Sequence, residues 1–368
     1  MYRKTFLKIN LDAIKYNLEA IQAVQKKKAI AVLKANAYGC GAKEVSEVMV
    51  EAGVEMIAVS SLDEAIAMRN FGYKNELLIL GHVDPINIPI LIQNDISTTA
   101  YSFNWVLEAI KQNCKNLKIH LKIETGMNRI GFTNLEELNQ AYDLLSEAGC
   151  LIEGIFTHFA CAESDEEKTL NQFNLFQKAY ESLNHSFKWI HTDNSYASVS
   201  FKDSLTNACR IGIGLYGYQD NIALKPVLSL YSQIFYVKQV HKNETIGYGA
   251  TYTAKEDIYV GTMPIGYADG FIRANQGRNV YIDGQLCEVV GRVCMDQTMI
   301  KLPSQIKEES LVEIFGPHIP LEEMANDLNT IPYEIICLIT SRVSRVYTKN
   351  NEVVKTENEY LDLSHHIR

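Results

Sequence analysis

The sequence predicts an α/β protein in which a (β/α)8, TIM-like barrel is followed by a C-terminal mainly-β domain. At 368 residues the chain exceeds what one hydrophobic core usually supports, which favours two domains. Up to about Gly217, short apolar runs alternate with segments of helical period, which is the pattern of a parallel sheet. Past Pro226 the pattern changes to alternating strands and tight turns. We therefore expect the barrel over residues 1–225 and the β domain over 226–368.

Eight apolar runs fit the strands of the barrel, and eight is the number of strands that closes one. In order, they are Ala29–Leu33, Met56–Ser60, Leu77–Leu80, Ser97–Tyr101, Ile119–Glu124, Leu151–His158, Trp189–Thr192 and Cys209–Leu215. Helices are expected between them, for example over Asp63–Asn70, Leu135–Ala148 and Glu166–Asn184. In the β domain, Asp283-Gly284 predicts a hairpin turn.

The composition excludes several classes of function. A net charge of −9 without a concentrated Lys/Arg face argues against nucleic acid as a partner. No apolar run is long enough to span a bilayer, so no membrane partner is expected. The eight cysteines are scattered without metal-ligand spacing, and the first residues lack the pattern of a secretory signal. We expect no metal and a cytoplasmic location.

Polar residues that follow the apolar runs are the first candidates for a site, because barrel enzymes carry their chemistry at the C-terminal ends of the strands. Lys34 ends the first run, and Tyr38 follows it closely. A surface lysine is the ordinary interpretation of Lys34. The neighbouring candidates change that interpretation, since an amine that carries a carbonyl cofactor also needs phosphate anchors and ring partners nearby.

Two segments predict a phosphate site. Asn194 and Ser195 follow the seventh run and are placed to open a helix whose N-terminal amides bind an anion. Gly212-Ile213-Gly214 lies in the eighth run, where glycine lets backbone N–H groups approach a phosphate closely. Phosphate sites after strands seven and eight recur in barrel enzymes.

Two arginines and two histidines fall near the same end of the barrel. Arg129 follows the fifth run, and Arg210 lies at the start of the eighth. His158 and His191 end the sixth and seventh runs, where they would orient Arg210 and a cofactor ring. Each of the four taken alone fits a structural role as well as a functional one.

Eight segments, in order and across nearly the whole chain, resemble alanine racemase. They are Lys34-Ala-Asn-Ala-Tyr-Gly, Thr125-Gly-Met-Asn-Arg-Ile-Gly, Thr157-His-Phe-Ala, Asn194-Ser195, Arg210-Ile-Gly-Ile-Gly-Leu-Tyr-Gly, Tyr248-Gly-Ala-Thr-Tyr, Ile265-Gly-Tyr-Ala-Asp-Gly and Gly291-Arg-Val-Cys-Met-Asp-Gln. The resemblance implies a pyridoxal 5'-phosphate enzyme that interconverts L-alanine and D-alanine and supplies D-alanine for peptidoglycan. It also implies a homodimer whose active sites are shared between the subunits.

The resemblance also implies roles for individual residues. Lys34 would bind the cofactor, with Tyr38, His158, Asn194, Ser195, Arg210, Gly212 and Ile213 as further cofactor-binding residues. Lys34 and Tyr248 would be the two bases, with Tyr248 donated by the partner subunit. Arg129 and the backbone N–H of Met295 would bind the substrate carboxylate, and Lys122 matches a lysine that many relatives carry as a carbamate.

Alternative functions follow from the same residues. Ser341 stands where some relatives have a tyrosine that narrows the substrate pocket, so a serine racemase or a broad-specificity racemase is the nearest alternative. A non-enzymatic pyridoxal-phosphate carrier with the barrel alone is opposed by Tyr248 and Met295 in the second domain. An amino-acid decarboxylase of the same plan is opposed by the lack of a triple-glycine phosphate loop.

Overall fold

The computed structural model describes residues 1–303 and 306–363 and divides them into two compact units. The first, which we call the barrel unit, comprises Ile14–Ala37 and Gly41–Lys225. The second, the β unit, comprises Met1–Ala13, Tyr38–Cys40 and the described residues from Pro226 onward. Across the described part of the chain, no helix combines the length and the apolar character needed to cross a membrane.

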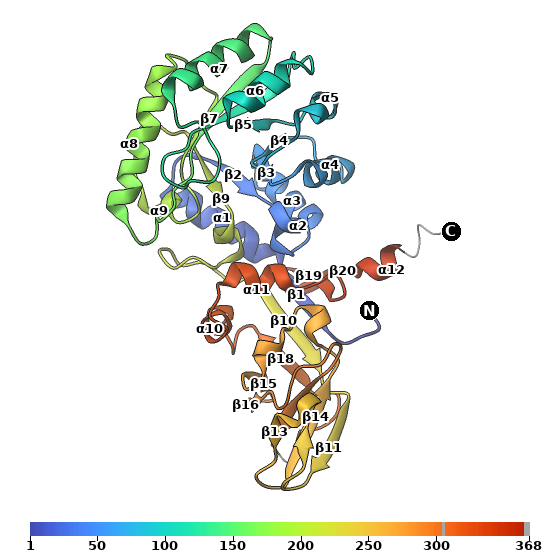
Figure 1. Cartoon of the computed structure of the whole chain (residues 1–368). Helices are drawn as coiled ribbons and strands as arrows, with labels where there is room; N and C mark the ends of the chain where they lie inside the picture. The colour runs from blue at the N-terminus through green and yellow to red at the C-terminus, as the bar shows by residue number, and fades with distance from the viewer. Residues whose placement is uncertain (304–305, 364–368) are drawn as a thin grey trace. The chain divides into compact units, whose positions relative to one another are not determined.

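The barrel unit is built on one sheet of eight parallel strands (Figure 1). They are β2 (Lys28–Val32), β3 (Met56–Val59), β4 (Glu76–Ile79), β5 (Thr98–Ala100), β6 (Lys118–Lys122), β7 (Leu151–Phe156), β8 (Trp189–His191) and β9 (Ala208–Ile211). Their order in the sheet is β4-β3-β2-β9-β8-β7-β6-β5. A parallel bridge between Leu78 and Ser97 joins the two outer strands and brings the sheet close to a closed barrel. All eight predicted runs therefore contain a strand, and the predicted fold class is confirmed.

Helices connect successive strands, as the βα pattern predicts. They are α1 (Leu11–Val24), α3 (Ala42–Glu51), α4 (Leu62–Asn70), α5 (Ile88–Gln93), α6 (Phe103–Ile110), α7 (Leu135–Glu147), α8 (Glu166–Ser182) and α9 (Ala197–Ser200). The side chains of Ser61, Asn134 and Asp165 begin α4, α7 and α8 by accepting hydrogen bonds from the first free N–H groups. The three helices that the sequence predicts agree with α4, α7 and α8.

The eighth predicted run, Cys209–Leu215, extends beyond the end of its strand. Strand β9 ends at Ile211, and Ile213–Tyr216 forms a 3-10 helix, η2. Gly212 breaks the strand with φ −111° and ψ −94°, and its N–H donates to Ser195 Oγ at 2.9 Å. The chain therefore turns at the barrel mouth directly after β9.

Strand register decides which side chains share the inner face of the barrel. Paired residues of neighbouring parallel strands point to the same face, as do residues two apart along one strand. The apolar cluster on this face takes residues from β2, β3, β4, β8 and β9: Ile30, Val32, Met56, Ala58, Leu78, Trp189 and Ala208. The same face of β6 to β9 carries polar and aromatic side chains: His120, Lys122, Phe156, His191 and Arg210.

The β unit has a seven-stranded sheet of order β16-β15-β18-β10-β1-β19-β20. These strands are β16 (Gln285–Glu288), β15 (Asn279–Ile282), β18 (Leu311–Phe315), β10 (Leu228–Gln233), β1 (Phe6–Asn10), β19 (Ser344–Lys349) and β20 (Glu352–Glu357). A three-stranded sheet follows the order β11 (Tyr236–Val240), β14 (Ile258–Met263) and β17 (Thr298–Leu302), and β12 (Thr245–Ile246) pairs with β13 (Tyr252–Thr253). Short helices α10 (Leu321–Asp327), α11 (Pro332–Leu338) and α12 (Glu359–Leu363) complete the described residues.

The N-terminal residues depart from the predicted domain range. The barrel was predicted over residues 1–225, but β1 pairs antiparallel with β10 and parallel with β19 inside the β unit. Met1–Ala13 therefore belong to the β unit, which the chain enters again at Pro226. The predicted hairpin is present, with Asp283 and Gly284 at φ 45° and 89° between β15 and β16.

Candidate active site

Lys34 opens an unusual turn directly after β2. Segment α2 (Lys34–Tyr38) contains four successive residues with positive φ, between 52° and 55° at Ala35, Asn36, Ala37 and Tyr38. This is the left-handed region, which costs an L-residue other than glycine roughly 1–2 kcal/mol. Neighbouring hydrogen bonds stabilise the turn, because Ala35 N–H donates to Glu64 Oε1 and Asn36 Oδ1 accepts from Ala42 N–H, each at 2.7 Å. The Lys34 side chain is exposed at this turn.

Ser195 and the segment after β9 form a hydrogen-bonded group, which we call the cradle. Ser195 is buried, and its Oγ accepts from the N–H groups of Gly212 at 2.9 Å and Gly214 at 3.3 Å. Ile213 follows as the first residue of η2, where an N–H group has no partner within the helix. A Cβ atom on Gly214 would lie 2.7 Å from Gln219 and 2.9 Å from Ile21, so glycine is required there. Asn194, by contrast, uses Oδ1 to bind Ala197 N–H at the start of α9.

Arg210 is the buried centre of the site, with a relative exposure of 3%. Nη1 donates to His191 Nδ1 at 2.7 Å and to the His191 carbonyl at 2.8 Å. Nη2 donates to the carbonyls of Thr157 and Thr192 and to His158 Nδ1 at 3.1 Å. Among the described residues no partner is found for Nε–H, which leaves it as the donor for a ligand. Burial lowers the pKa of Arg210 to about 10, so the guanidinium is still charged at neutral pH.

Four basic side chains influence the pKa of His158. Burial, and then the charges of Arg210, Arg129, Lys122 and Lys34 in that order, lower the pKa of His158 well below 6.5. The imidazole is therefore neutral and is held among positive charges. Such a concentration of like charge in a partly dehydrated site is favourable only when an anion completes it.

Lys122 lies inside the barrel at a relative exposure of 3%. Its Nζ donates to the Ile123 carbonyl at 2.8 Å and lies 5.5 Å from the ring centre of Phe156. Burial, followed by the charges of Arg210 and Arg129, lowers the pKa of Lys122 to about 7 against an opposing contribution from Glu124. A large fraction of this amine is therefore neutral near pH 7.

The loop after β6 presents Arg129 at the surface of the barrel unit. Glu124 organises this loop, since its carboxylate accepts from the N–H groups of Gly126 at 2.6 Å and Arg129 at 3.2 Å. Beside the loop, α8 carries Gln172, whose amide contacts Thr125 Oγ1, the His158 carbonyl and Ala160 N–H. Gln172 thus connects the segments that follow β6 and β7.

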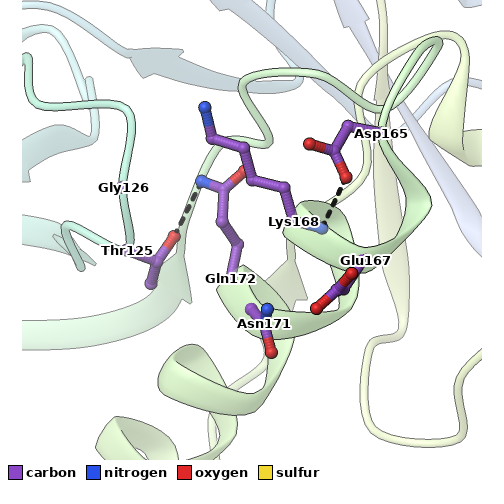
Figure 2. Close-up of a pocket in the computed structure, with 7 residues that line it drawn as sticks. All are labelled: Thr125, Gly126, Asp165, Glu167, Lys168, Asn171 and Gln172. Atoms are coloured by element: carbon purple, nitrogen blue, oxygen red, sulfur yellow. Dashed lines mark hydrogen bonds between the residues drawn. The ribbon is translucent and has the colours of Figure 1, made fainter.

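A polar pocket of about 290 Å³ lies between this loop and the first turns of α8. Figure 2 shows its lining residues, with the Gln172 amide directed at Thr125. They are Thr125, Gly126, Asp165, Glu167, Lys168, Asn171 and Gln172. None of them is a predicted site residue.

Three predicted site residues lie in the β unit. Tyr38 is buried, and its ring centre lies 6.0 Å from that of Tyr333. Burial is the main reason why the pKa of Tyr38 is raised above its ordinary value. Tyr248 and Met295 are large side chains with high relative exposures, 71% and 53%. Both side chains are therefore largely open to solvent in the described subunit.

Two of the segments that carry the resemblance pack directly on one another in the β unit. A Cβ atom on Gly266 would lie 2.3 Å from both the Cys294 and Met295 carbonyls, so this contact requires glycine. Ala268 N–H donates to the Met295 carbonyl at 3.1 Å. The fully buried Asp269 pairs with Arg3 at 2.7 Å, which ties the start of the chain to this segment.

Sequence reasoning missed Glu64, Gln172 and His120. Glu64 and Gln172 lie on helices α4 and α8, where a polar residue predicts nothing more than an exposed face. His120 had a usable signal, because it alternates with Lys122 on β6 and so shares the inner face of the barrel.

The fold and these residues define an α/β-barrel protein that has an amine, a buried arginine and the Ser195 cradle after its strands. Comparison with known proteins shows the family. Models of the alanine racemase N-terminal domain and C-terminal domain match residues 9–220 and 227–347. The chain therefore belongs to the alanine racemase family, and it is an isomerase.

Relatives in sequence and in structure agree with this assignment. The chain is 41% identical over 362 residues to an alanine racemase of Streptococcus pyogenes, covering 94% of this chain and 99% of the relative. It resembles the crystal structure of alanine racemase from Bacillus anthracis with bound L-Ala-P at 36% identity and a TM-score of 0.94, covering 98% and 99% of the two chains. A histidine racemase from Leuconostoc mesenteroides is more distant, at 27% identity and a TM-score of 0.85 over 95% of this chain and 99% of that one.

Proposed function

We propose that this chain carries out the alanine racemisation of its family with pyridoxal 5'-phosphate, using Lys34 and Tyr248 as bases on opposite faces of the substrate. The observation that carries the proposal is the concentration of Lys34, Lys122, Arg129 and Arg210 around a neutral His158. A cofactor phosphate, the phenolic oxygen of the cofactor and a substrate carboxylate are the anions that such a site would balance.

The residues present fit pyridoxal phosphate, a cofactor on which the family depends. Ser195, Gly212 and Ile213 would hold the phosphate with the hydroxyl and the backbone N–H groups of the cradle, and we expect Tyr38 and Asn194 to contribute. Arg210 would donate its remaining Nε–H to the pyridine nitrogen. Because the guanidinium stays charged, that nitrogen would remain unprotonated.

Racemisation needs a proton removed from one face of the α-carbon and a proton delivered to the other, which two bases perform better than one. When bound, the cofactor would withdraw electrons from the α-carbon and acidify its proton. The Lys34 amine would take the α-proton of D-alanine, and the phenolate oxygen of Tyr248 would take that of L-alanine. In the direction from D- to L-alanine, protonated Tyr248 would then give its proton to the α-carbon. In the reverse direction, protonated Lys34 would do so.

The second base requires a second subunit in this proposal. Tyr248 and Met295 are both more than half exposed in the β unit, as expected of side chains that complete a partner's site. In a twofold homodimer each barrel would receive the β unit of the other chain. The substrate carboxylate would then meet Arg129 and the backbone N–H of the partner subunit's Met295.

Lys122 is the proposed site of a carbamate. A neutral amine attacks carbon dioxide, forms an N–C bond and releases one proton, and the lowered pKa of Lys122 supplies the neutral amine near pH 7. The product carries a negative charge between Arg210 and Arg129, where the lysine itself would place a third positive charge. Incorporation of labelled bicarbonate, detected by ¹³C NMR and lost in Lys122→Met, tests this step.

The wider role follows from the family. D-alanine made by this enzyme would enter peptidoglycan, and we place the enzyme in the cytoplasm. All eight cysteines lie within the described residues as free thiols, which suits a reducing compartment.

The decisive experiment incubates the purified protein and pyridoxal phosphate with L-alanine, and separately with L-serine, in deuterated water. Optical inversion and deuterium at the α-carbon are followed together. We expect alanine to invert with α-deuteration and Lys34→Ala to lose both signals by at least a factor of about 10². Absence of exchange with either amino acid would refute the two-base proposal and favour a carrier.

Serine is the second candidate substrate, because Ser341 leaves a small side chain where some relatives place tyrosine. An added hydroxyl changes selectivity by only about 1–3 kcal/mol in a pocket that does not exclude it by shape. Inversion of serine at a rate comparable with alanine would make this chain a racemase of broader specificity.

A further inference from the structure

Arg210, His191 and His120 form a continuous row of hydrogen bonds inside the barrel. Arg210 Nη1 lies 2.7 Å from His191 Nδ1, and His191 Nε2 lies 2.9 Å from His120 Nδ1. Both imidazoles are fully buried at 0% exposure, and Arg210 is buried at 3%. The row runs from strand β9 through β8, across to β6.

The row has a direction, because arginine has donors only. His191 Nδ1 must accept from Arg210, so a neutral His191 carries its hydrogen on Nε2 and donates it to His120 Nδ1. His120 in turn carries its hydrogen on Nε2, which is buried and has no partner among the described residues. Burial lowers the pKa of His120 to about 3 and that of His191 well below 6.5, in agreement with two neutral rings.

Packing holds both rings in place. A Cβ atom at Gly154 on β7 would lie 2.3 Å from His120 Nδ1, so the neighbouring strand leaves space for this ring only because it has glycine there. Phe156 stacks on His191 with ring centres 4.7 Å apart and an angle of 7° between the planes. The Arg210 guanidinium lies 5.3 Å from the centre of the same Phe156 ring.

This order of donors places the unsatisfied imidazole N–H of the row on His120, two side chains away from the guanidinium. Without an acceptor at His120, the buried Nε2–H of His191 would lose its partner. The alternative tautomer would turn an Nδ1–H toward the N–H groups of Arg210. Either arrangement is unfavourable in a buried site and would weaken the hydrogen bond from Arg210 Nη1 to His191 Nδ1.

We propose that His120 is a positioning residue for the racemase reaction, which fixes the tautomer of His191 and through it the orientation of Arg210 toward the cofactor. This proposal rests on the proposed function in one respect, namely that Arg210 contacts the cofactor. The tautomer of His191 is a property of the chain itself.

Two variants of His120 distinguish the effect of its hydrogen-bond acceptor from the effect of the space that its ring fills. In His120→Asn the side-chain oxygen takes the place of Nδ1 as an acceptor, whereas His120→Leu fills the space without one. Full-length protein loaded with pyridoxal phosphate and labelled with ring-¹⁵N histidine reports which nitrogen of His191 carries hydrogen. We expect Nε2–H in the wild type and in His120→Asn, and a shifted or mixed signal in His120→Leu.

Kinetics with alanine supply the second measurement. Loss of one buried hydrogen bond to a neutral group predicts a fall in kcat of about tenfold for His120→Leu, with KM changed by less than about twofold. We expect His120→Asn to stay within about threefold of the wild type. Leu121→Val, on the opposite face of β6, is the control for a loosened core and should leave the His191 signal unchanged. His120→Phe replaces His120→Leu if the latter does not fold.

The outcomes distinguish this proposal from the proposed function. Hydrogen on Nδ1 of His191 in the wild type, or equal effects of the Asn and Leu variants, would overturn the role of His120. A wild type that shows the expected tautomer but racemises no amino acid would instead overturn the proposed function.

Discussion

Lys122 lies in an environment unlike that of an ordinary lysine, because it is buried inside the barrel. A lysine with a relative exposure of 3% has lost most of its hydration, and Arg210 and Arg129 add repulsion. Proteins rarely keep such a group unless it has chemistry to perform. The two consequences, a neutral amine and a pH-dependent stability, are measurable independently of any activity.

The folded-state pKa of Lys122 is about 7, below the value of 10.5 for an unperturbed lysine. Between these values the unfolded chain binds more protons than the folded chain, so the free energy of unfolding rises with pH over this window. We expect wild type to gain stability relative to Lys122→Met from pH 7 to pH 10, as measured by urea unfolding in buffers free of carbon dioxide. Lys43→Met, at an exposed position of α3, is the control. Parallel curves for wild type and Lys122→Met would contradict the prediction.

At the scale of an element, the turn Lys34–Tyr38 depends on a residue from another helix. Glu64 on α4 accepts from Ala35 N–H at 2.7 Å and from both the N–H and the hydroxyl of Ser60 at 2.8 and 2.9 Å. It thereby connects the ends of β2 and β3. The position of Lys34 relative to the barrel therefore depends on Glu64.

Removing this carboxylate should affect both stability and activity. We expect Glu64→Ala to lower the free energy of unfolding by about 1–2 kcal/mol, since three hydrogen bonds to a charged group are lost at a partly exposed position. Alanine racemisation should fall with it as Lys34 loses its support. Asp63→Ala removes the same charge one residue earlier and should leave activity near that of the wild type. Equal behaviour of the two variants would show that Glu64 acts only through charge at the start of α4.

The strands show what the sequence can and cannot predict at this scale. All eight barrel strands were recognisable because each is a short apolar run between helices. The left-handed turn was not, because Ala35 and Ala37 have no preference for positive φ. Here the turn has a hydrogen bond from Ala35 N–H to Glu64, a residue far along the chain. The place of β1 was also missed, since Phe6–Asn10 alternates in a way that fits either sheet and is decided by pairing with β10 and β19 far along the chain.

Site residues that belong to sequence motifs were predictable, whereas those placed by packing between strands were not. Arg210, His158 and His191 were predicted to act together, and the structure places both histidines in hydrogen bonds with Arg210. Gly154 contributes by leaving space for the His120 ring through the register of β6 and β7, which a single sequence does not reveal.

In the whole molecule, one described subunit has most of the proposed cofactor residues in its barrel unit. Tyr38 and the second proposed base, Tyr248, lie in its β unit. If subunits exchange β units, an active site is complete only in a dimer. This arrangement makes activity depend on pairs of chains rather than on single ones.

Heterodimers of Lys34→Ala with Tyr248→Phe test the exchange directly. Each parental homodimer lacks one base in both sites, so its racemase activity should fall by at least a factor of about 10² relative to the wild type. A dual-tagged heterodimer would contain one site with both bases and one with neither, so we expect about half of wild-type activity per dimer. A heterodimer of wild type with Lys34→Ala should also show about half. An inactive Lys34→Ala and Tyr248→Phe pair would mean that both bases come from one chain.

The turn after Lys34 is the mirror image, residue by residue, of an ordinary helical turn. Its backbone geometry is therefore the relaxed conformation of D-amino acids and the strained one of the L-residues that occupy it. Chemical synthesis with D-alanine at positions 35 and 37 should raise the free energy of unfolding by about 1–2 kcal/mol per site while leaving the fold unchanged. The segment beside the reactive lysine would thus be more stable if built from the enantiomer that the proposed reaction produces.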